Sequence, residues 1–197
     1  MGRPKTYDRE SVTRKAMELF WAQGYEATST RALAEHMGIN VYSLFSEFKS
    51  KQGLYEAALA LYRTEVVARV FAQLETPDAG FEEVDALLRF FSDRAGAADA
   101  GRGCLACNAA SERAGDDSAS HAYVMAHIAH IEAGIRRALT RARKHGELRA
   151  DVSCRDQSRL LTAVLLGFSL LMRAGAEPTY LKQAVRAARA DLRRLRA

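Results

Sequence analysis

Apolar residues recur at helical spacing along nearly the whole chain, and this periodicity constrains the fold more than any other feature. In the first such segment one helical face collects Val12, Ala16, Leu19 and Phe20. No stretch alternates apolar and polar residues as a half-buried strand would, and only three prolines interrupt the 197 residues. The sequence therefore predicts an all-α protein.

Capping residues set the ends of the predicted helices. Asp8 is a good N-cap for a first helix that runs to residue 23, and Gly24 ends that helix. The predicted helices that follow span residues 29–37, 41–48, 51–74, 80–94, 104–113, 118–145, 153–173 and 179–195. No flexible linker separates the first helices from the rest. We therefore expect the long helix at 51–74 to be a rigid connection that belongs to both parts of the chain.

The two short helices are separated by a three-residue turn, Gly38-Ile39-Asn40. Gly38 can adopt the positive φ of a tight turn at low steric cost. Ile39 can insert its side chain between the two helices, and Asn40 can accept a hydrogen bond from a free amide at the start of the second. This is the geometry by which one short helix braces another against the major groove of DNA.

The outward face of the second short helix favours DNA binding. Small or hydrogen-bonding residues (Val41, Tyr42, Ser43 and Ser46) lie opposite an apolar face of Leu44, Phe45 and Phe48. A solvated helix face is the alternative interpretation, although Val41 and Tyr42 are unusual choices beside a short polar turn. The motif occurs by chance in many all-α proteins, so the turn alone leaves both interpretations open.

Four segments carry a resemblance to a known family: the GRPK start, AMELFWAQGYEATS, RALAEHMGIN and SLFSEFKSKQGL. Over the first 55 or so residues they strongly resemble the TetR family of bacterial repressors. The remainder resembles this family in its helix count and in pieces such as GRGCLACNAA and HGELRAD. The resemblance implies a helix-turn-helix domain of three helices at residues 1–54. It also implies a larger helical domain at 55–197 for effector binding and dimerisation, and release from a palindromic operator by a small molecule.

The resemblance also implies which residues contact double-stranded operator DNA: Arg3, Lys5, Thr28, Thr30, Arg31, Asn40, Val41, Tyr42, Ser43, Ser46 and Lys51. Of these, Val41, Tyr42, Ser43 and Ser46 are expected to face base edges, and Lys51 to hold a phosphate. Arg3 and Lys5 either reach the minor groove or form a tail without a role. The family's phosphate-contacting tyrosine is Phe45 here, so that contact is lost unless Tyr42 or Ser46 replaces it.

Charge is compatible with DNA binding but does not establish it. The chain carries a net charge of +5. Residues 1–56, however, hold eight Lys or Arg against seven Asp or Glu, so the predicted DNA-binding part is almost neutral. Most of the excess lies in IRRALTRARK and in the C-terminal VRAARADLRRLRA. Charged helix faces exposed to water account for those two stretches.

The last two predicted helices supply a candidate dimer face: Leu161, Val164, Leu165, Phe168, Met172, Leu181, Val185 and Leu192. Periodicity alone fits a protomer core equally well, but the resemblance implies an intersubunit four-helix bundle and hence a homodimer. The resemblance also implies an effector pocket, with these candidate lining residues: Leu87, Phe90, Phe91, Cys104, Cys107, Asn108, Tyr123, Met125 and His127. Each of these is also compatible with ordinary core packing.

The chain has three cysteines, an odd number, which does not indicate a disulfide framework. Cys104 and Cys107 leave three interpretations open. Both can be small buried hydrophobes. Alternatively, Cys104 at a helix N-terminus can be a reactive thiolate that responds to oxidants or electrophiles. Zinc binding with His127 and His130 is the third, but the histidine spacing is shorter than usual, and we expect no metal or cofactor.

Other functional classes find little support in the sequence. No apolar run approaches the roughly 20 residues that a membrane helix needs, and MGRPKTYDRE has no apolar stretch typical of a secretory signal. We therefore expect a cytoplasmic protein without a membrane partner. A thiol oxidoreductase would place its CxxC beside a βαβ unit, so we expect no enzyme. A helical scaffold without DNA binding would leave the Gly38-Ile39-Asn40 turn and Lys51 unexplained.

Overall fold

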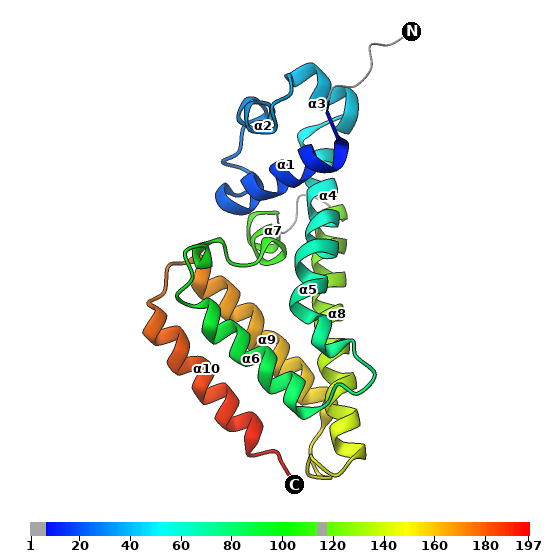
Figure 1. The fold of residues 1–197 in the computed structure, drawn as a ribbon, viewed down its shortest axis with the longest axis vertical. Helices are drawn as coiled ribbons and strands as arrows, with labels where there is room; N and C mark the ends of the chain where they lie inside the picture. The colour runs from blue at the N-terminus through cyan, green and yellow to red at the C-terminus, as the bar shows by residue number, and fades with distance from the viewer. Residues whose placement is uncertain (1–6, 114–117) are drawn as a thin grey trace.

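A computed structural model describes residues 7–113 and 118–197 and shows helices throughout (Figure 1). The first three helices, α1 (Arg9–Gln23), α2 (Thr30–Met37) and α3 (Val41–Phe48), form a small head at one end of the molecule. The predicted capping residues are confirmed. Asp8 accepts a hydrogen bond from the Ser11 amide at 2.7 Å, and Gly24 ends α1 with a φ of 89°.

A long helical rod leads from the head into the rest of the molecule (Figure 1). It begins as α4 (Lys51–Tyr62), passes through one π-helical turn (Arg63–Val67), and continues as α5 (Ala68–Phe71) and a 3-10 turn (Ala72–Leu74). The sequence predicted one helix over 51–74, and the prediction is confirmed. The π turn was not predicted, and it widens the backbone in the middle of the rod.

The body of the molecule is built from five further helices: α6 (Phe81–Arg94), α7 (Leu105–Arg113), α8 (Ser118–Lys144), α9 (Cys154–Arg173) and α10 (Pro178–Arg193). All of them end within two residues of the predicted positions. A 3-10 turn (Ala100–Arg102) precedes α7. Across the described ranges, β pairing is limited to one isolated bridge between Leu148 and Arg196. The all-α prediction is therefore confirmed.

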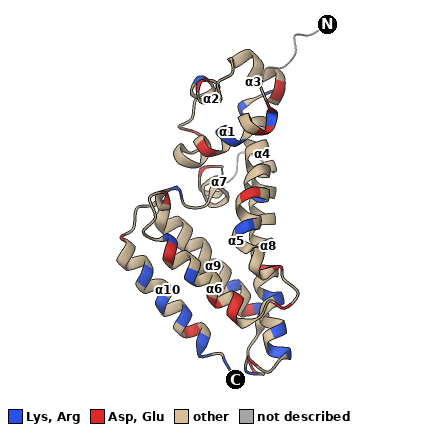
Figure 2. Cartoon of the chain, viewed as in Figure 1, with Lys and Arg blue, Asp and Glu red and all other residues tan. Residues whose placement is uncertain are grey.

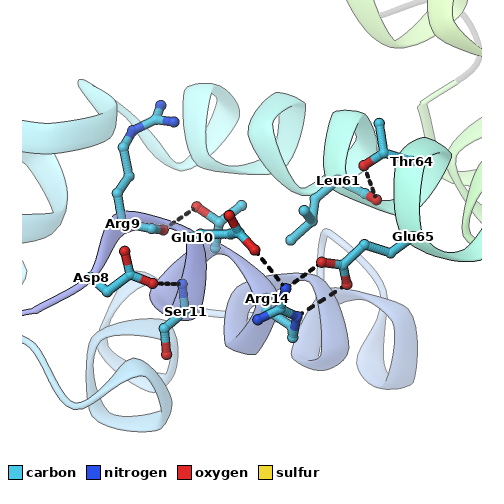
Figure 3. A network of polar contacts seen from close by, with 9 residues as sticks. Asp8, Arg9, Glu10, Ser11, Arg14, Leu61, Thr64 and Glu65 are labelled. Carbon is cyan, nitrogen blue, oxygen red and sulfur yellow. Dashed lines mark hydrogen bonds and ion pairs between the residues drawn. The ribbon is translucent and has the colours of Figure 1, made fainter.

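The head is fastened to the rod by an aromatic core and a polar clamp. The ring of Phe20 on α1 meets Tyr55 on α4 edge-on, with centroids 4.9 Å apart. Figure 3 shows the clamp. Arg14 on α1 is hydrogen-bonded to both carboxylate oxygens of Glu65 in the π turn and, at 2.8 Å, to Glu10. This guanidinium lowers the pKa of the Glu65 carboxyl. A displacement of the rod at the π turn would therefore be transmitted to α1 through the bonds between Glu65 and Arg14.

A buried acid fastens α10 to α6. The Asp85 carboxylate on α6 accepts hydrogen bonds from Arg189 at 2.9 and 2.7 Å and from Arg193 at 3.1 Å. Hydrogen bonding to these guanidiniums, Arg189 first, lowers the pKa of Asp85. Figure 2 shows that Lys and Arg are frequent along α10, and this pair of arginines accounts for part of that charge. Within residues 7–113 and 118–197, no helix is both long and apolar enough to cross a membrane.

Candidate DNA interface and ligand cavity

The turn between α2 and α3 has the geometry that its three residues predict. Gly38 adopts a left-handed conformation with a φ of 74°. The Ile39 amide donates to the Ala34 carbonyl at 3.0 Å, and the Ile39 side chain is partly buried against the core. The Asn40 side chain accepts from the Ser43 amide at 2.7 Å and so caps α3. The turn fixes α3 against α2 while α3 keeps one face free.

The outward face of α3 is open to solvent. Tyr42 is 82% exposed and Val41 38%, and Ser46 is also exposed, whereas Ser43 is half-buried. Leu44 and Phe48 are buried, as predicted. Phe45 was predicted to lie on the inward face, and this prediction is wrong, because its side chain is 42% exposed. Phe45 thus adds an aromatic ring to the outward face that the sequence pattern assigned to the core.

The structure places the predicted phosphate-contacting residues in three different environments. Thr28 is fully buried, and its hydroxyl donates to the Gly24 carbonyl at 2.5 Å. It therefore cannot reach DNA. Ser29 is the N-cap of α2, and its hydroxyl accepts a hydrogen bond from the Ala32 amide at 3.1 Å. Thr30 is half-buried and Arg31 is exposed in the first turn of α2. Arg3 and Lys5 lie outside the described residues.

Two cations border α3 at its C-terminal end. The Lys51 ammonium lies over the Tyr25 ring at 4.1 Å from the centroid, which fixes the side chain beside the start of α4. Lys49 is exposed, with a φ of 69°, and donates to the Ser46 carbonyl at 3.0 Å. The site prediction did not include Lys49, although its position directly after α3 would have indicated it. Acidic residues elsewhere in the head keep its overall charge mixed, as Figure 2 shows.

A cavity of about 400 Å³ lies in the body, between the rod and helices α6, α8 and α9. Of the nine predicted lining residues, four line it: Phe90, Phe91, Cys104 and His127. Leu165 and Met172, which were predicted at the dimer face, line this cavity instead. The sequence did not indicate the contributions of Trp21 in the head and of Tyr62 and Arg69 in the rod, because these segments have the same helical periodicity as core helices, nor that of Arg94 at the end of α6.

The other predicted pocket residues have different surroundings. Leu87 is buried in the core, and the Asn108 amide donates to the Arg102 carbonyl at 3.1 Å. Tyr123 stacks on His127 with ring centroids 6.5 Å apart, and Cys107 lines a neighbouring groove beside α8. Met125 is 50% exposed on α8 and outside the cavity, so its assignment to a pocket is wrong.

Cys104 and His127 meet at the cavity wall, with 3.6 Å between Sγ and Nε2. Hydrogen bonds from Cys107 and from His127 lower the pKa of Cys104 well below its ordinary value. The same contact with Cys104 raises the pKa of Cys107, because its thiol is the donor. The described residues contain no group of three or more His, Cys, Asp or Glu that could hold a metal ion.

A groove of about 430 Å³ runs between α9 and α10. Two rows of residues line it with the same 4-3-4 spacing: Leu160, Val164, Gly167 and Leu171 on α9, and Ala184, Ala188 and Asp191 on α10 with Leu195 just after its end. Leu160 is 56% exposed, and an added Cβ at Gly167 would meet no atom within 4 Å. The groove therefore offers an apolar seam with small residues along it.

The structure divides the residues of the predicted dimer face between the protomer interior and this groove, and the subunit contact stays a prediction. Seven of the eight residues are buried within the protomer: Leu161, Leu165, Phe168, Met172, Leu181, Val185 and Leu192. Of these, Leu161, Phe168 and Leu192 also line the groove, whereas Leu165 and Met172 line the cavity. Of the eight, Val164 alone is only half-buried, and it belongs to the open row of α9.

Comparison with known proteins decides the family. A family model described as bacterial regulatory proteins, tetR family, matches residues 12–58, and one described as tetracyclin repressor-like, C-terminal domain, matches residues 80–188. The chain belongs to the TetR family. It is thus a DNA-binding transcriptional regulator, and the matched residues cover both the head with its α2-turn-α3 unit and most of the body.

Individual relatives agree with this assignment. The HTH-type transcriptional repressor ComR of Escherichia coli (strain K12) is 31% identical over 92% of this chain and 87% of its own length. The uncharacterized HTH-type transcriptional regulator YezE of Bacillus subtilis (strain 168) is 27% identical over 90% of this chain and 92% of its own. A cysteine mutant of the TetR family regulator CifR, solved with 26-base-pair operator DNA, is 30% identical with a TM-score of 0.83, over 96% of this chain and 98% of CifR.

Proposed function

We propose that this TetR-family protein is a repressor that binds a palindromic operator as a symmetric homodimer and leaves it when a small molecule enters the cavity. The observation that carries the proposal is the outward face of α3, where Tyr42 is 82% exposed on a helix held by a capped turn. The curated relative ComR is named a repressor, and the similar CifR structure holds operator DNA.

Side chains of α3 would read base edges while the residues around it contact phosphates. Tyr42, Val41 and Ser46 are exposed on the outward face, with the half-buried Ser43 at its edge. Arg31 in the first turn of α2 and Lys51 at the start of α4 would supply cationic phosphate contacts beside that face. Phosphate contacts of this kind position a protein, and base contacts give it specificity.

The open rows of α9 and α10 would meet the same rows of a second copy. Gly167, Ala184 and Ala188 let two helices approach closely, and Leu160 and Leu171 would fill the space between them. Such a contact is isologous, so the two heads are related by a two-fold axis and read half-sites roughly 34–36 Å apart or a multiple of this distance. In this arrangement we propose residues 1–54 as the DNA-binding domain and residues 55–197 as the effector and dimer domain.

A ligand in the cavity would act on the head through the rod. Val66, Val70 and Phe71 of the rod line the cavity, and so does Trp21 of α1. The clamp between Arg14 and Glu65 joins α1 to the π turn of the same rod. A ligand that displaces the rod would therefore change the angle of the head, and with it the spacing of the two heads on DNA.

Selection from a random pool of duplex DNA tests the proposal. We expect the purified protein to retain fragments that share a palindrome, and sequencing would show two half-sites of fixed spacing. Tyr42→Ala on the intact chain provides a folded comparison, and we expect it to retain fewer of these fragments because a side chain of the outward face of α3 is lost. Retention of fragments without a common sequence would contradict the proposal.

A further inference from the structure

Cys104 and Cys107 form a dithiol in the first turn of α7. The Asn108 amide donates to the Cys104 carbonyl at 2.9 Å, so Cys104 takes the N-cap position and Cys107 the third position of the helix. Cys104 therefore receives hydrogen bonds from the backbone amide and the thiol of Cys107, and His127 Nε2 lies 3.6 Å from its Sγ. Once His127 has taken the proton of Cys104, its Nε2–H is a third donor that stabilises the thiolate.

The two thiols face different surroundings. Cys104 lines the cavity together with His127, whereas Cys107 lines the shallow groove beside α8. A molecule in the cavity thus meets Cys104 first, with Cys107 directly behind it. The third cysteine, Cys154, is buried at the start of α9 and lines neither space. This arrangement gives one half-buried nucleophile that borders the cavity, with a second thiol within hydrogen-bonding contact.

We propose that Cys104 and Cys107 are a peroxide-reactive pair, in which Cys104 attacks a hydroperoxide in the cavity and Cys107 then closes a Cys104–Cys107 disulfide. Two cysteines separated by two residues at a helix start have the spacing that permits such a bond. His127 acts as the proton acceptor and donor at Cys104.

The chemistry balances without any further reactant. His127 takes the proton of the Cys104 thiol, and the thiolate attacks one oxygen of the O–O bond. That bond breaks, the other oxygen leaves as alkoxide, and it takes the proton back from His127 to give an alcohol. Cys104 is now a sulfenic acid. Cys107 attacks its sulfur, the S–S bond forms, the S–O bond breaks, and water leaves with the Cys107 proton.

The cavity favours an organic hydroperoxide over hydrogen peroxide. Its walls include apolar side chains, among them Val70, Phe91 and Ile131, and its volume is about 400 Å³. An apolar group would be bound there through desolvation, and it would hold the O–O bond beside Cys104. Hydrogen peroxide has the same reactive bond but gains nothing from these walls. Comparison of the two oxidants therefore tests whether the cavity takes part.

The dithiol also lies where it can affect the head, a consequence that rests on the proposed function. Gly103, directly before Cys104, accepts a hydrogen bond from the Trp21 indole on α1 at 3.0 Å. At the other end of α7, the Glu112 carboxylate accepts from the Tyr25 amide at 2.6 Å. A disulfide across the first turn of α7 would change the position of Gly103 and hence the contact with Trp21.

The test follows intact mass after treatment of the full-length protein with cumene hydroperoxide or hydrogen peroxide. We expect a loss of two hydrogens with both oxidants, and a faster loss with cumene hydroperoxide, by roughly tenfold or more for a ligand held by apolar walls. Peptide mapping should find the disulfide between Cys104 and Cys107. The variant Cys107→Ser should instead gain one oxygen at Cys104, which dimedone traps, and Cys104→Ser should not react.

Two further variants separate a specific reaction from general oxidation. Cys154→Ser should behave as the wild type. His127→Phe keeps a ring of similar size but removes the proton acceptor. It should shift the alkylation of Cys104 by iodoacetamide to higher pH, because the pKa of Cys104 rises when the His127 hydrogen bond is lost. A Cys104 that stops at sulfenic acid in the wild type, a Cys154 that reacts as fast, or a disulfide between two chains would each overturn the proposal.

Binding to the selected operator then measures the coupling separately. We expect the oxidised wild type to lose affinity for DNA by on the order of tenfold, which corresponds to a typical coupling between two sites. Cys107→Ser should keep its affinity under the same treatment. If the reduced protein binds no DNA at all, the proposed function fails, whereas the mass measurement still decides whether the dithiol reacts.

Discussion

The outward face of α3 and the groove between α9 and α10 both present apolar side chains to solvent, but they differ in shape and in the polarity of the neighbouring residues. On α3, Tyr42 and Val41 stand on an eight-residue helix beside serines and an asparagine. The groove is longer and lined by two matching rows with few polar side chains, of which Asp191 is one. Polar neighbours allow α3 to meet a hydrated base edge, whereas the groove needs an equally apolar partner.

This difference separates two roles within one chain. A short, convex and mixed surface fits a groove of DNA, where hydrogen bonds to bases discriminate between sequences. A long seam with glycine and alanine fits another pair of helices, where close packing supplies the free energy. Exposure of apolar side chains alone would not distinguish the two surfaces, and the neighbouring residues do.

The largest expected effect comes from blocking the groove. Gly167→Arg introduces a long charged side chain where an added Cβ meets no other atom of the protomer, so we expect the single chain to fold as before. Close approach of a second copy would bury this charge without a partner. Sedimentation should then show a monomer, and affinity for the selected palindrome should fall by on the order of 100-fold or more, since two linked heads bind far more tightly than one.

Gly96→Arg is the matched control for that variant. Gly96 lies in the loop after α6, and an added Cβ there also meets nothing within 4 Å. We expect it to keep both the dimer and the affinity for DNA. A Gly167→Arg protein that remains a dimer would place the subunit contact on another face of the molecule.

The next largest effect is expected at α3. Tyr42→Ala removes the most exposed aromatic side chain of the head and should weaken binding to the selected operator by about 10–100-fold, the range of a good base contact. Because Tyr42 packs against little else, thermal unfolding should be unchanged. Met125→Ala, which truncates an exposed apolar side chain on α8, provides the control and should bind as the wild type. Equal losses in both variants would show that Tyr42 has no special role.

A smaller and uniform effect is expected at Lys51. Lys51→Ala should weaken binding by roughly tenfold for the selected operator and for unrelated DNA alike, because a phosphate contact carries no sequence information. The slope of log affinity against log salt should decrease by about one for each half-site. The control is Lys182→Ala on α10, far from α3. If Lys51→Ala instead changed the sequence preference and left the slope of log affinity against log salt unchanged, Lys51 would contact a base and not a phosphate.

The smallest effect is a gain. Phe45 is 42% exposed and occupies the position where the family has a tyrosine. Phe45→Tyr should therefore strengthen DNA binding by about threefold, the value of one modest hydrogen bond to a phosphate. Fluorescence anisotropy with the selected operator measures it. Weaker binding would indicate that the Phe45 ring packs against an apolar part of the DNA or lies away from it.

Local sequence rules were sufficient for the helices and for the turn. Asp8 and Asn40 cap their helices with the side chain as predicted, and Gly38 takes the left-handed conformation that the turn requires. These contacts span three or four residues, so a single sequence contains all the information. The same is true of the outward positions Val41, Tyr42 and Ser46, which follow from the helical period once the inward residues are known.

Long-range packing could not be predicted in the same way. The Thr28 hydroxyl donates to the Gly24 carbonyl inside the head, and Leu165 and Met172, which were predicted at the dimer face, line the cavity. An apolar stripe on α9 indicates that the helix is buried, but it does not indicate whether its own body or a partner covers it. Trp21 and Arg94 line the same cavity although 73 positions separate them in sequence. Only the tertiary arrangement places them together.

The most direct test of the account compares two selections from one random DNA pool. One uses the wild type, and the other uses a variant that carries both Val41→Ala and Tyr42→Ala, which leaves the buried face of α3 unchanged. We predict that the two enriched palindromes share their half-site spacing but differ at the same base positions in both halves. Enrichment of one identical sequence by both proteins would contradict the claim that the outward face of α3 reads DNA.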